Sequence, residues 1–404
     1  MSQKTKKLVT FLKFIDKGLA WISIQFIRFY QITISPDKWI LSPFLKGRVC
    51  SHNPHCSAYW IQVLERYWFV QWLPMITDRV LACKPSSEKM YDPDHYRVIF
   101  FSSAPIGVPF LKELINDKRF EVVGVVSQED KPVGRWLKLT PNIIKTTALE
   151  NWIPWEDVYT PTKIHPDKSL EWKHFYDWLC EKWADYFVVI AYWKIIPQVI
   201  LDIPVFGCIN VHGSLLPKYR WASPLQSVFL NNEEMSWITI MHMDAGMDTG
   251  AMIDKLAFKI SFGWTVKDLI EKFEEKWPEF LTDTLWDYAK WSIKSNPQND
   301  EHATYCQKIT KQDWEIDPYK DSIESIYSKY RWYYLWPKIW FTLNDKKVTI
   351  EELVLDEVKY NELKDAPLFD KNNSLNACVK GIGLKPEGKK AMDYKSFKNW
   401  YLKN

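Results

Sequence analysis

The first part of the chain, residues 1–94, places apolar and charged residues at helical spacing. In LVTFLKFIDKGLAWISIQFIRFYQ, apolar residues recur every three or four positions, and lysine or arginine residues fall between them. This period predicts an amphipathic helix that lies on a surface. Helical patterns around VLERY and LPMITDRVLACKP follow, so we expect a small all-helical unit.

Residues 95–293 carry a different pattern, in which short apolar runs alternate with longer amphipathic stretches. RVIFF, EVVGVVS and YFVVIAY are typical of buried strands, and segments such as LEWKHFYDWLCEKW separate them as helices. This alternation favours a Rossmann-like parallel sheet, which binds ligands at the carboxyl ends of its strands. We therefore expect a multidomain α/β protein whose central domain holds the functional site.

The pattern changes again after the polar linker SNPQNDEHA. Residues 302–404 contain short alternating stretches with polar turns between them: TYCQKI, IWFTL, KVTIEELVL and ACVKGIGLK. Short strands of this kind predict a small C-terminal β-barrel of the OB type.

Composition adds limits to this picture. A chain of 404 residues exceeds what one hydrophobic core organises, and 47% hydrophobic with 25% charged residues is typical of a folded protein. The net charge of +3 requires no nucleic acid, and we expect no DNA partner. Apolar runs stay short of the ~18 residues that a membrane span needs. The seven cysteines are an odd and widely spread set, which favours a reducing cytosol.

Tryptophan and glycine occur in unusual numbers. The chain has 23 Trp and 13 Gly, whereas average usage would give about 28 glycines. Trp stands where turns favour Gly, because only Gly adopts positive φ at low cost. Our hypothesis is that the gene reads UGA as glycine; the alternative is a genuinely Trp-rich protein. The hypothesis covers Trp39, Trp60, Trp68, Trp72, Trp136, Trp152, Trp193, Trp221, Trp237, Trp277, Trp291, Trp314, Trp332 and Trp400.

Two segments carry the chemistry, INVHGSLLPKYR and, some thirty residues later, MDAGMDTG. Asn210 can donate its amide N–H to a developing oxyanion, and His212 projects to the same side if the segment is extended. Asp248 returns on a glycine-flanked turn and can orient the imidazole, and we expect this pairing to favour protonated His212. A lone histidine is usually structural, but the combined pattern indicates acyl transfer to an amine.

These motifs resemble the formyltransferases that use 10-formyltetrahydrofolate, and LKPEGKKAM near the C-terminus narrows the resemblance to methionyl-tRNA formyltransferases. The resemblance implies that Asn210, His212 and Asp248 are catalytic. It also implies an initiator methionyl-tRNA substrate and no metal. It further assigns Ser214, Leu215, Leu216 and Pro217 to the folate site, and Arg135 and Lys138 in KPVGRWLKLTP to tRNA contacts.

Residues 29–94 resemble the YidD family of membrane protein insertion efficiency factors through FYQITISPDKW, CSHNPHCSAYW, RVLACKP and YDP. Its motif centres on Cys50, Cys56 and Cys83, with His52 and His55 nearby. Zinc binding, burial in a helical core and a redox pair remain open for these cysteines. The basic amphipathic helix places the chain peripherally on the cytoplasmic face of the inner membrane, unless that helix packs only on its own domain.

The predicted function is formyl transfer from 10-formyltetrahydrofolate to the α-amino group of methionyl-tRNA, with a fused module that aids membrane protein insertion. The alternative is an insertion factor whose formyltransferase domain is inactive or acts on an amino sugar or a nucleotide precursor. The sequence leaves the oligomeric state open, and it does not decide between one fused polypeptide and two adjacent reading frames.

Overall fold

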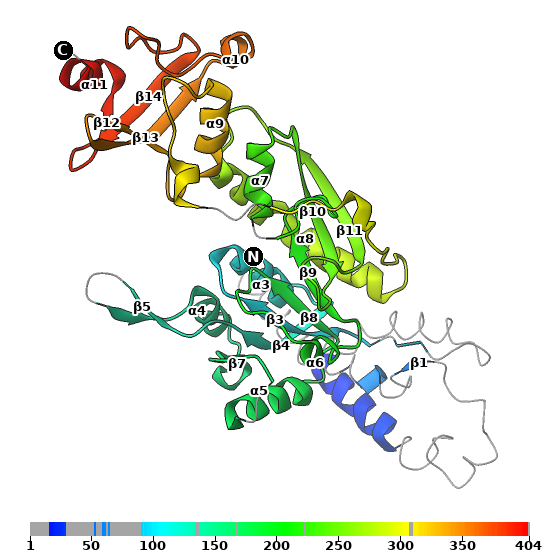
Figure 1. Cartoon of the computed structure of the whole chain (residues 1–404). Helices are drawn as coiled ribbons and strands as arrows, with labels where there is room; N and C mark the ends of the chain where they lie inside the picture. The colour runs from blue at the N-terminus through cyan, green and yellow to red at the C-terminus, as the bar shows by residue number, and fades with distance from the viewer. Residues whose placement is uncertain are drawn as a thin grey trace, which may run out of the picture. The chain divides into compact units, whose positions relative to one another are not determined.

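The computed structural model describes a defined part of the chain in two compact units, Met1–Tyr96 and Arg97–Asn404 (Figure 1). Cys50, Cys56, Cys83 and Arg135, on which sequence predictions rest, lie outside the described residues. The described residues are 16–29, 52–53, 59–61, 64, 90–91, 93–133, 137–166, 169–221, 223–306 and 310–402.

In the first unit, residues 16–29 form the predicted amphipathic helix. Ala20, Ile24 and Ile27 are buried and pack with Leu64, so one face of the helix does cover its own domain. A short parallel pair, β1 (His52–Asn53) and β2 (Met90–Tyr91), departs from the all-helical prediction. No helix among the described residues is both long and apolar enough to cross a membrane.

The second unit is built on a seven-stranded sheet with the order β11-β10-β9-β8-β3-β4-β7. Pairing is parallel between β3 and β8, β8 and β9, and β4 and β7, as the alternating pattern predicts. The antiparallel pair β10 and β11 at one edge was not predicted. The strands are β3 (Tyr96–Ser102), β4 (Phe120–Val126), β7 (Val158–Tyr159), β8 (Tyr186–Ile190), β9 (Cys208–His212), β10 (Met235–His242) and β11 (Met252–Lys259).

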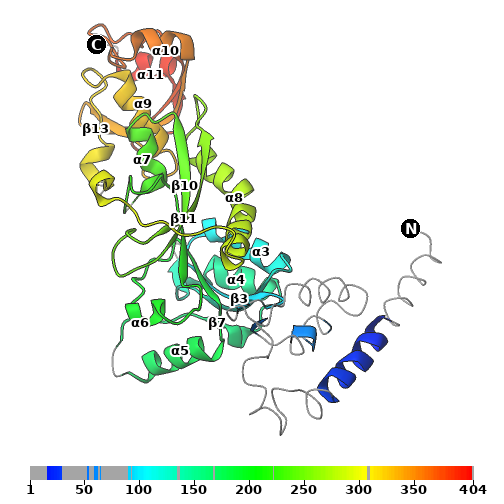
Figure 2. The ribbon, with the colours of Figure 1, turned by 90° about the vertical axis from the view of Figure 1, so that its right-hand side faces the viewer.

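Helices cover both faces of this sheet, which explains its continuous apolar strands. Phe187 of β8 packs in one core cluster with Phe175 of α5 (Leu170–Glu181) and Ile200 of α6 (Gln198–Leu201). Tyr186 points to the other face, where its hydroxyl donates to Leu285 O of α8 (Val266–Ala289) at 2.9 Å. α3 (Val108–Asn116) packs beside α8 there (Figure 2).

A two-stranded ribbon lies outside the main sheet. β5 (Lys131–Val133) and β6 (Lys138–Thr140) pair antiparallel, and α4 (Ile143–Glu150) follows them (Figure 1). This ribbon contains the segment that the sequence assigned to tRNA contacts.

The C-terminal block is an antiparallel sheet of order β12-β13-β14-β15, as its alternating stretches predict. Tyr305, in the predicted strand TYCQKI, instead bridges to Arg220 near the central sheet. Its strands are β12 (Trp340–Leu343), β13 (Lys346–Leu355), β14 (Val379–Pro386) and β15 (Met392–Asp393), and the helices α9 (Ile323–Trp332), α10 (Glu357–Leu363) and α11 (Tyr394–Tyr401) were not predicted.

One apolar core joins the C-terminal block to the central domain. Phe229 of α7 (Pro224–Leu230) and Leu269 of α8 belong to the same buried cluster as Ile326 of α9 and Phe341 of β12. Both views show α9 next to α7 (Figures 1 and 2). Residues 97–404 therefore fold as one compact unit.

Candidate active site

The site begins at the end of β9, which carries Asn210 and His212 two residues apart. β9 pairs with β8 on one side, Asn210 opposite Val189, and with β10 on the other, His212 opposite Thr239. Because side chains alternate along a strand, Asn210 and His212 lie on the same face, as predicted. Asn210 is half-buried, and its amide has no hydrogen-bond partner within the described part of the chain.

Asp248 lies in the turn between β10 and β11. Its backbone is in the left-handed region, with φ of 56°. Asp244 shapes the turn, because its carboxylate accepts hydrogen bonds from Gly246 N and Thr249 Oγ1. Gly250 allows the turn to close on β10, since a Cβ at this position would lie 2.0 Å from His242 O.

The structure brings His212 and Asp248 together. His212 Nδ1 lies 3.6 Å from Asp248 Oδ2, and His212 Nε2 lies 3.0 Å from Tyr219 O. The same carboxylate oxygen accepts the backbone N–H of Trp221 at 2.9 Å. The imidazole is 6% exposed, so these contacts form in a site with little access to water.

Burial decides the protonation of His212. It lowers the pKa of the imidazole, and the Asp248 carboxylate and Tyr219 O only partly oppose this effect. Asp248 does raise the pKa of His212, as the sequence analysis predicted. The prediction that the ring is protonated overall is wrong, because burial lowers the pKa by more. A buried cation loses more hydration than one carboxylate at 3.6 Å restores.

The residues assigned to the folate site follow β9 directly. Ser214 and Leu216 are buried, and Leu215 and Pro217 are half-buried. The Ser214 hydroxyl donates to Lys218 O at 2.6 Å, and a cis peptide joins Leu216 to Pro217. Folate contacts of these four residues stay a prediction.

Lys138 is exposed on β6, whereas Arg135 lies outside the described residues. Their tRNA contacts also stay a prediction. As for metals, the described residues contain no group of three or more His, Cys, Asp or Glu side chains arranged to hold an ion.

Two side chains at the site were missed by the sequence analysis. Arg220 is almost fully buried, and its guanidinium donates to Gln298 Oε1 at 2.8 Å. Gln298 in turn donates to Asp248 O and Gly250 O, both at 2.8 Å. Gln298 lies in the polar linker SNPQNDEHA, for which the sequence analysis predicted no role beyond joining two domains.

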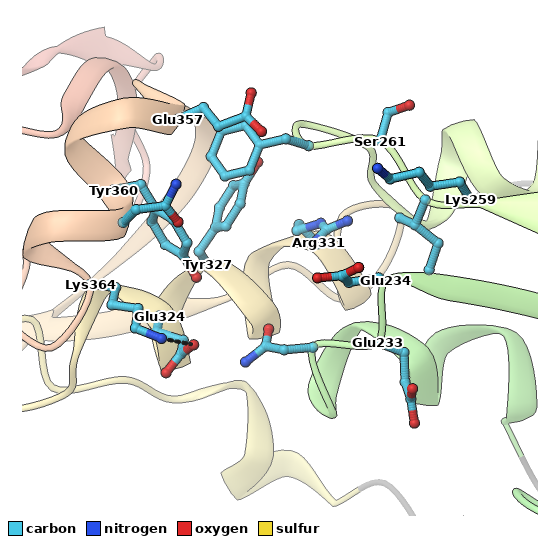
Figure 3. A pocket seen from close by; sticks show the side chains of 14 residues that line it. Glu233, Glu234, Lys259, Ser261, Glu324, Tyr327, Arg331, Glu357, Tyr360 and Lys364 are labelled. Carbon is cyan, nitrogen blue, oxygen red and sulfur yellow. Dashed lines mark ion pairs between the residues drawn. The ribbon is translucent and has the colours of Figure 1, made fainter.

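A separate cavity of about 660 Å³ lies between the central domain and α9 and α10 (Figure 3). Asn210, His212 and Asp248 do not line it. Arg331 rests on the Phe229 ring at 4.4 Å and donates to Trp264 O. At its rim, Glu233 accepts the hydroxyl of Tyr219 at 2.7 Å, which connects this cavity to the loop beside His212.

Residues 96–285, which form the seven-stranded sheet, match the formyl transferase family, and this match makes the protein a formyltransferase. Residues 308–402 match the C-terminal domain of formyl transferases. The chain belongs to the methionyl-tRNA formyltransferase family, since the enzyme of Rickettsia bellii (strain RML369-C) is 36% identical over 305 residues, which are 74% of this chain and 95% of the relative.

Other known proteins are also similar to parts of this chain. The methionyl-tRNA formyltransferase of Clostridioides difficile (strain 630) is 37% identical over 262 residues, which cover 65% of this chain and 81% of that protein. The crystal structure of WlaRD, a sugar 3N-formyl transferase, in the presence of dTDP and 5-N-formyl-THF, superimposes with a TM-score of 0.48 at 19% identity, covering 74% and 98% of the two chains. Residues 19–95 match the family of putative membrane protein insertion efficiency factors.

Proposed function

We propose that residues 96–402 transfer a formyl group from 10-formyltetrahydrofolate to the α-amino group of initiator methionyl-tRNA. The observation that carries the proposal is the convergence at the end of β9, where His212 Nδ1 lies 3.6 Å from Asp248 and Asn210 shares its face of the strand. When bound, the folate supplies the activated formyl carbon. The residues described here bind, orient and move protons around it.

Asn210 stabilises the charge that develops on the formyl oxygen. Its amide has no partner among the described residues, so its N–H groups are free to donate to a substrate. Donors that are fixed in place before the reaction act more strongly than water, because they need no reorganisation. A half-buried amide without a partner among the described residues supports the proposal that this site binds a carbonyl group.

His212 receives the proton that the attacking amine releases. Both neighbours of the ring, Tyr219 O and the Asp248 carboxylate, accept hydrogen bonds, so a neutral imidazole can donate to only one of them. We assign the proton to Nε2, whose contact is the shorter. Nδ1 then faces Asp248, and a proton arriving there has a carboxylate as its counter-charge.

The acceptor is proposed from family membership and supported by two features. The ribbon of β5 and β6 presents Lys138 to solvent, and the C-terminal sheet shares one core with the central domain. The C-terminal sheet is thereby held to the domain that carries the three site residues, and both surfaces are available for contacts with a nucleic acid backbone.

The test is formylation of charged initiator tRNA by the full chain, with 10-formyltetrahydrofolate as donor. Wild-type protein should turn over, and His212→Ala should lose roughly 10² to 10⁴ in kcat while keeping its unfolding midpoint. His174→Ala, on the exposed side of α5, is the matched control. Turnover on an amino sugar nucleotide, but none on methionyl-tRNA, would favour the alternative substrate class.

We also propose that the N-terminal unit attaches the enzyme peripherally to the cytoplasmic face of the membrane. The 16–29 helix buries one apolar face against Leu64, yet it exposes Trp21, Ile22 and Phe26 on the rest of its surface. An apolar face of this kind inserts into the headgroup region of a bilayer. The match of residues 19–95 to putative insertion efficiency factors supports a role at the membrane.

Cosedimentation with phosphatidylglycerol vesicles tests this attachment. Phe26→Glu should reduce the bound fraction, whereas Val358→Glu, at an equally exposed apolar position of α10, should leave it unchanged. Equal binding of the Phe26→Glu variant and wild type would refute the attachment.

A further inference from the structure

The linker between the two formyl transferase matches is bound to the catalytic loops. Asn296 and Met252 exchange backbone hydrogen bonds of 2.7 and 2.8 Å beside β11. Further along, Arg220 N donates to Thr304 O, and Cys306 N donates to Arg220 O, both at 2.8 Å. The linker therefore runs along the loops that carry the site.

Gln298 lies at the centre of this contact, and its amide is fully used. Nε2 donates to Asp248 O and to Gly250 O, and Oε1 accepts Nη2 and Nε of Arg220 at 2.8 and 3.2 Å. Two donors and two lone pairs are all that a carboxamide offers. The side chain is thus held at both ends.

Arg220 fixes which way the amide points. A guanidinium only donates, so it must face Oε1, and the NH₂ group must face the turn. The Arg220 side chain is buried and forms an ion pair with Asp300 at 2.6 Å. The orientation of Gln298 therefore follows from a charged group that has little freedom to move.

The turn that Gln298 holds needs support. Asp248 has a positive φ of 56°, a conformation that costs energy for a residue with a side chain, although aspartate adopts it more readily than most. The carbonyl of Asp248 is itself one acceptor of the Gln298 amide. Its carboxylate, on the same residue, faces His212 at 3.6 Å. Gln298 thus connects the linker to the catalytic carboxylate through one backbone unit.

We propose that Gln298 is a positioning residue that holds Asp248 against His212, with Arg220 orienting its amide. The proposal rests on the formyl transfer proposed above. All the hydrogen bonds of the Gln298 amide go to protein groups, so its loss should lower kcat and leave KM for both substrates unchanged. Displacing a catalytic group by about 1 Å can cost on the order of 10²-fold in rate.

Gln298→Glu is the sharpest variant, because glutamate keeps the size and the contact with Arg220 but cannot donate to the two carbonyls. We expect a kcat decrease of roughly 10- to 100-fold with KM unchanged. The acidic limb of the profile of kcat against pH should also shift, because Asp248 no longer faces His212. Gln312→Glu, exposed at the start of the C-terminal block, is the matched control and should behave as wild type.

A double-mutant cycle with Asp248→Asn tests whether Gln298 acts through Asp248. If Gln298 acts through Asp248, Gln298→Glu should lower kcat little further in the Asp248→Asn background. Wild-type kcat for Gln298→Glu, or two losses that multiply, would overturn the proposal. An inactive wild type would instead refute the proposed function.

Should Gln298→Glu fail to fold, Asp300→Asn takes its place. This substitution lies at an exposed carboxylate and only loosens Arg220. It should lower kcat severalfold at constant KM, and wild-type kcat in this variant would then overturn the proposal.

Discussion

At the level of single residues, the charge of His212 results from two opposed effects. Burial removes water from the ring and disfavours the cation, whereas Asp248 favours it. The first effect is larger, so the resting imidazole is neutral near pH 7, as the proposed proton acceptor has to be. Pattern analysis could identify the pair, but not how deeply the fold buries it.

Asn210→Ala should lower kcat by roughly 10² to 10³, the usual cost of removing one oxyanion donor. The amide has no structural partner among the described residues, so the unfolding midpoint should stay at its wild-type value. Steady-state formylation and urea unfolding measure the two quantities. Asn372→Ala, exposed beyond α10, serves as control, and a kcat within twofold of wild type at position 210 would argue against the oxyanion role.

Asp248→Asn should move the acidic limb of the kcat profile to lower pH. Asp248 raises the pKa of His212 against the effect of burial, so its neutralisation lets burial lower that pKa further. At the same time kcat should fall, because a proton on Nδ1 loses its counter-charge. A profile of kcat against pH measures both effects, and a limb that moves upward would contradict this arrangement.

The sequence could identify the trio because its members sit in two compact motifs. The sequence analysis missed Gln298 and Arg220 for a physical reason. Gln298 is separated in the sequence by 50 residues from Asp248 and by 78 residues from Arg220. It lies in a linker whose apolar residues follow no helix or strand pattern. Only the folded backbone brings them together.

At the level of elements, three helices end in the same way. Trp152, Trp183 and Trp291 directly follow the last cap of α4, α5 and α8, and their φ angles are 65°, 47° and 60°. Trp152 N donates to Leu149 O and Ile153 N to Ala148 O, the pattern of a Schellman cap. Glycine is the residue favoured directly after a helix cap, and asparagine is the next most favoured. Asn232 takes this position after α7.

These caps support glycine decoding at Trp152 and Trp291, and they add Trp183, which the sequence analysis did not include. Mass spectrometry of the protein from its own cells should show glycine at these three positions. Intact tryptophan there would contradict the hypothesis. Trp277 and Trp332, also in the hypothesised set, are buried, so their environment gives no such support.

Glycine at the helix ends should also stabilise the protein. Trp152→Gly removes a left-handed residue with a side chain, which costs about 1–2 kcal/mol, and so should raise the free energy of unfolding. Trp155→Gly is the control, because Trp155 is also largely exposed, at 80% against 93% for Trp152, but has no positive φ. Urea unfolding of both variants measures the difference, and a gain at position 155 alone would refute the reasoning.

Most strands were predictable, because buried apolar runs and alternating stretches are strong local signals. α9 was missed, since IESIYSKYRW places its aromatic residues among charges and its buried face appears only against Phe341 and Ile350. The antiparallel edge of β10 and β11 was not predicted, because the direction of these strands depends on the short turn at Asp248 rather than on composition.

At the level of the whole molecule, stability should fall as pH drops below about 6.5. Burial lowers the pKa of both His212 and His242, so the unfolded chain binds protons there before the folded chain does. Their contribution is fully present above about pH 6.5 and is lost as pH falls towards their folded values. Urea midpoints between about pH 7.5 and 5 measure this loss.

His242→Gln should reduce that slope, because one of the two buried imidazoles is gone. His174→Gln, at the exposed histidine of α5, should leave the slope unchanged. A slope that is the same in all three proteins would show that other groups control acid stability.

The path of the linker also bears on how this enzyme can be divided. A fragment that stops at residue 285, where the first formyl transferase match ends, would keep every member of the trio. It would nevertheless lack Gln298, which donates to the carbonyls of Asp248 and Gly250, and Asp300, which forms the ion pair with Arg220. The boundary given by sequence similarity and the boundary given by these hydrogen bonds therefore fall at different residues. A fragment that keeps every contact of the linker with the loop at Arg220 has to extend at least to Cys306.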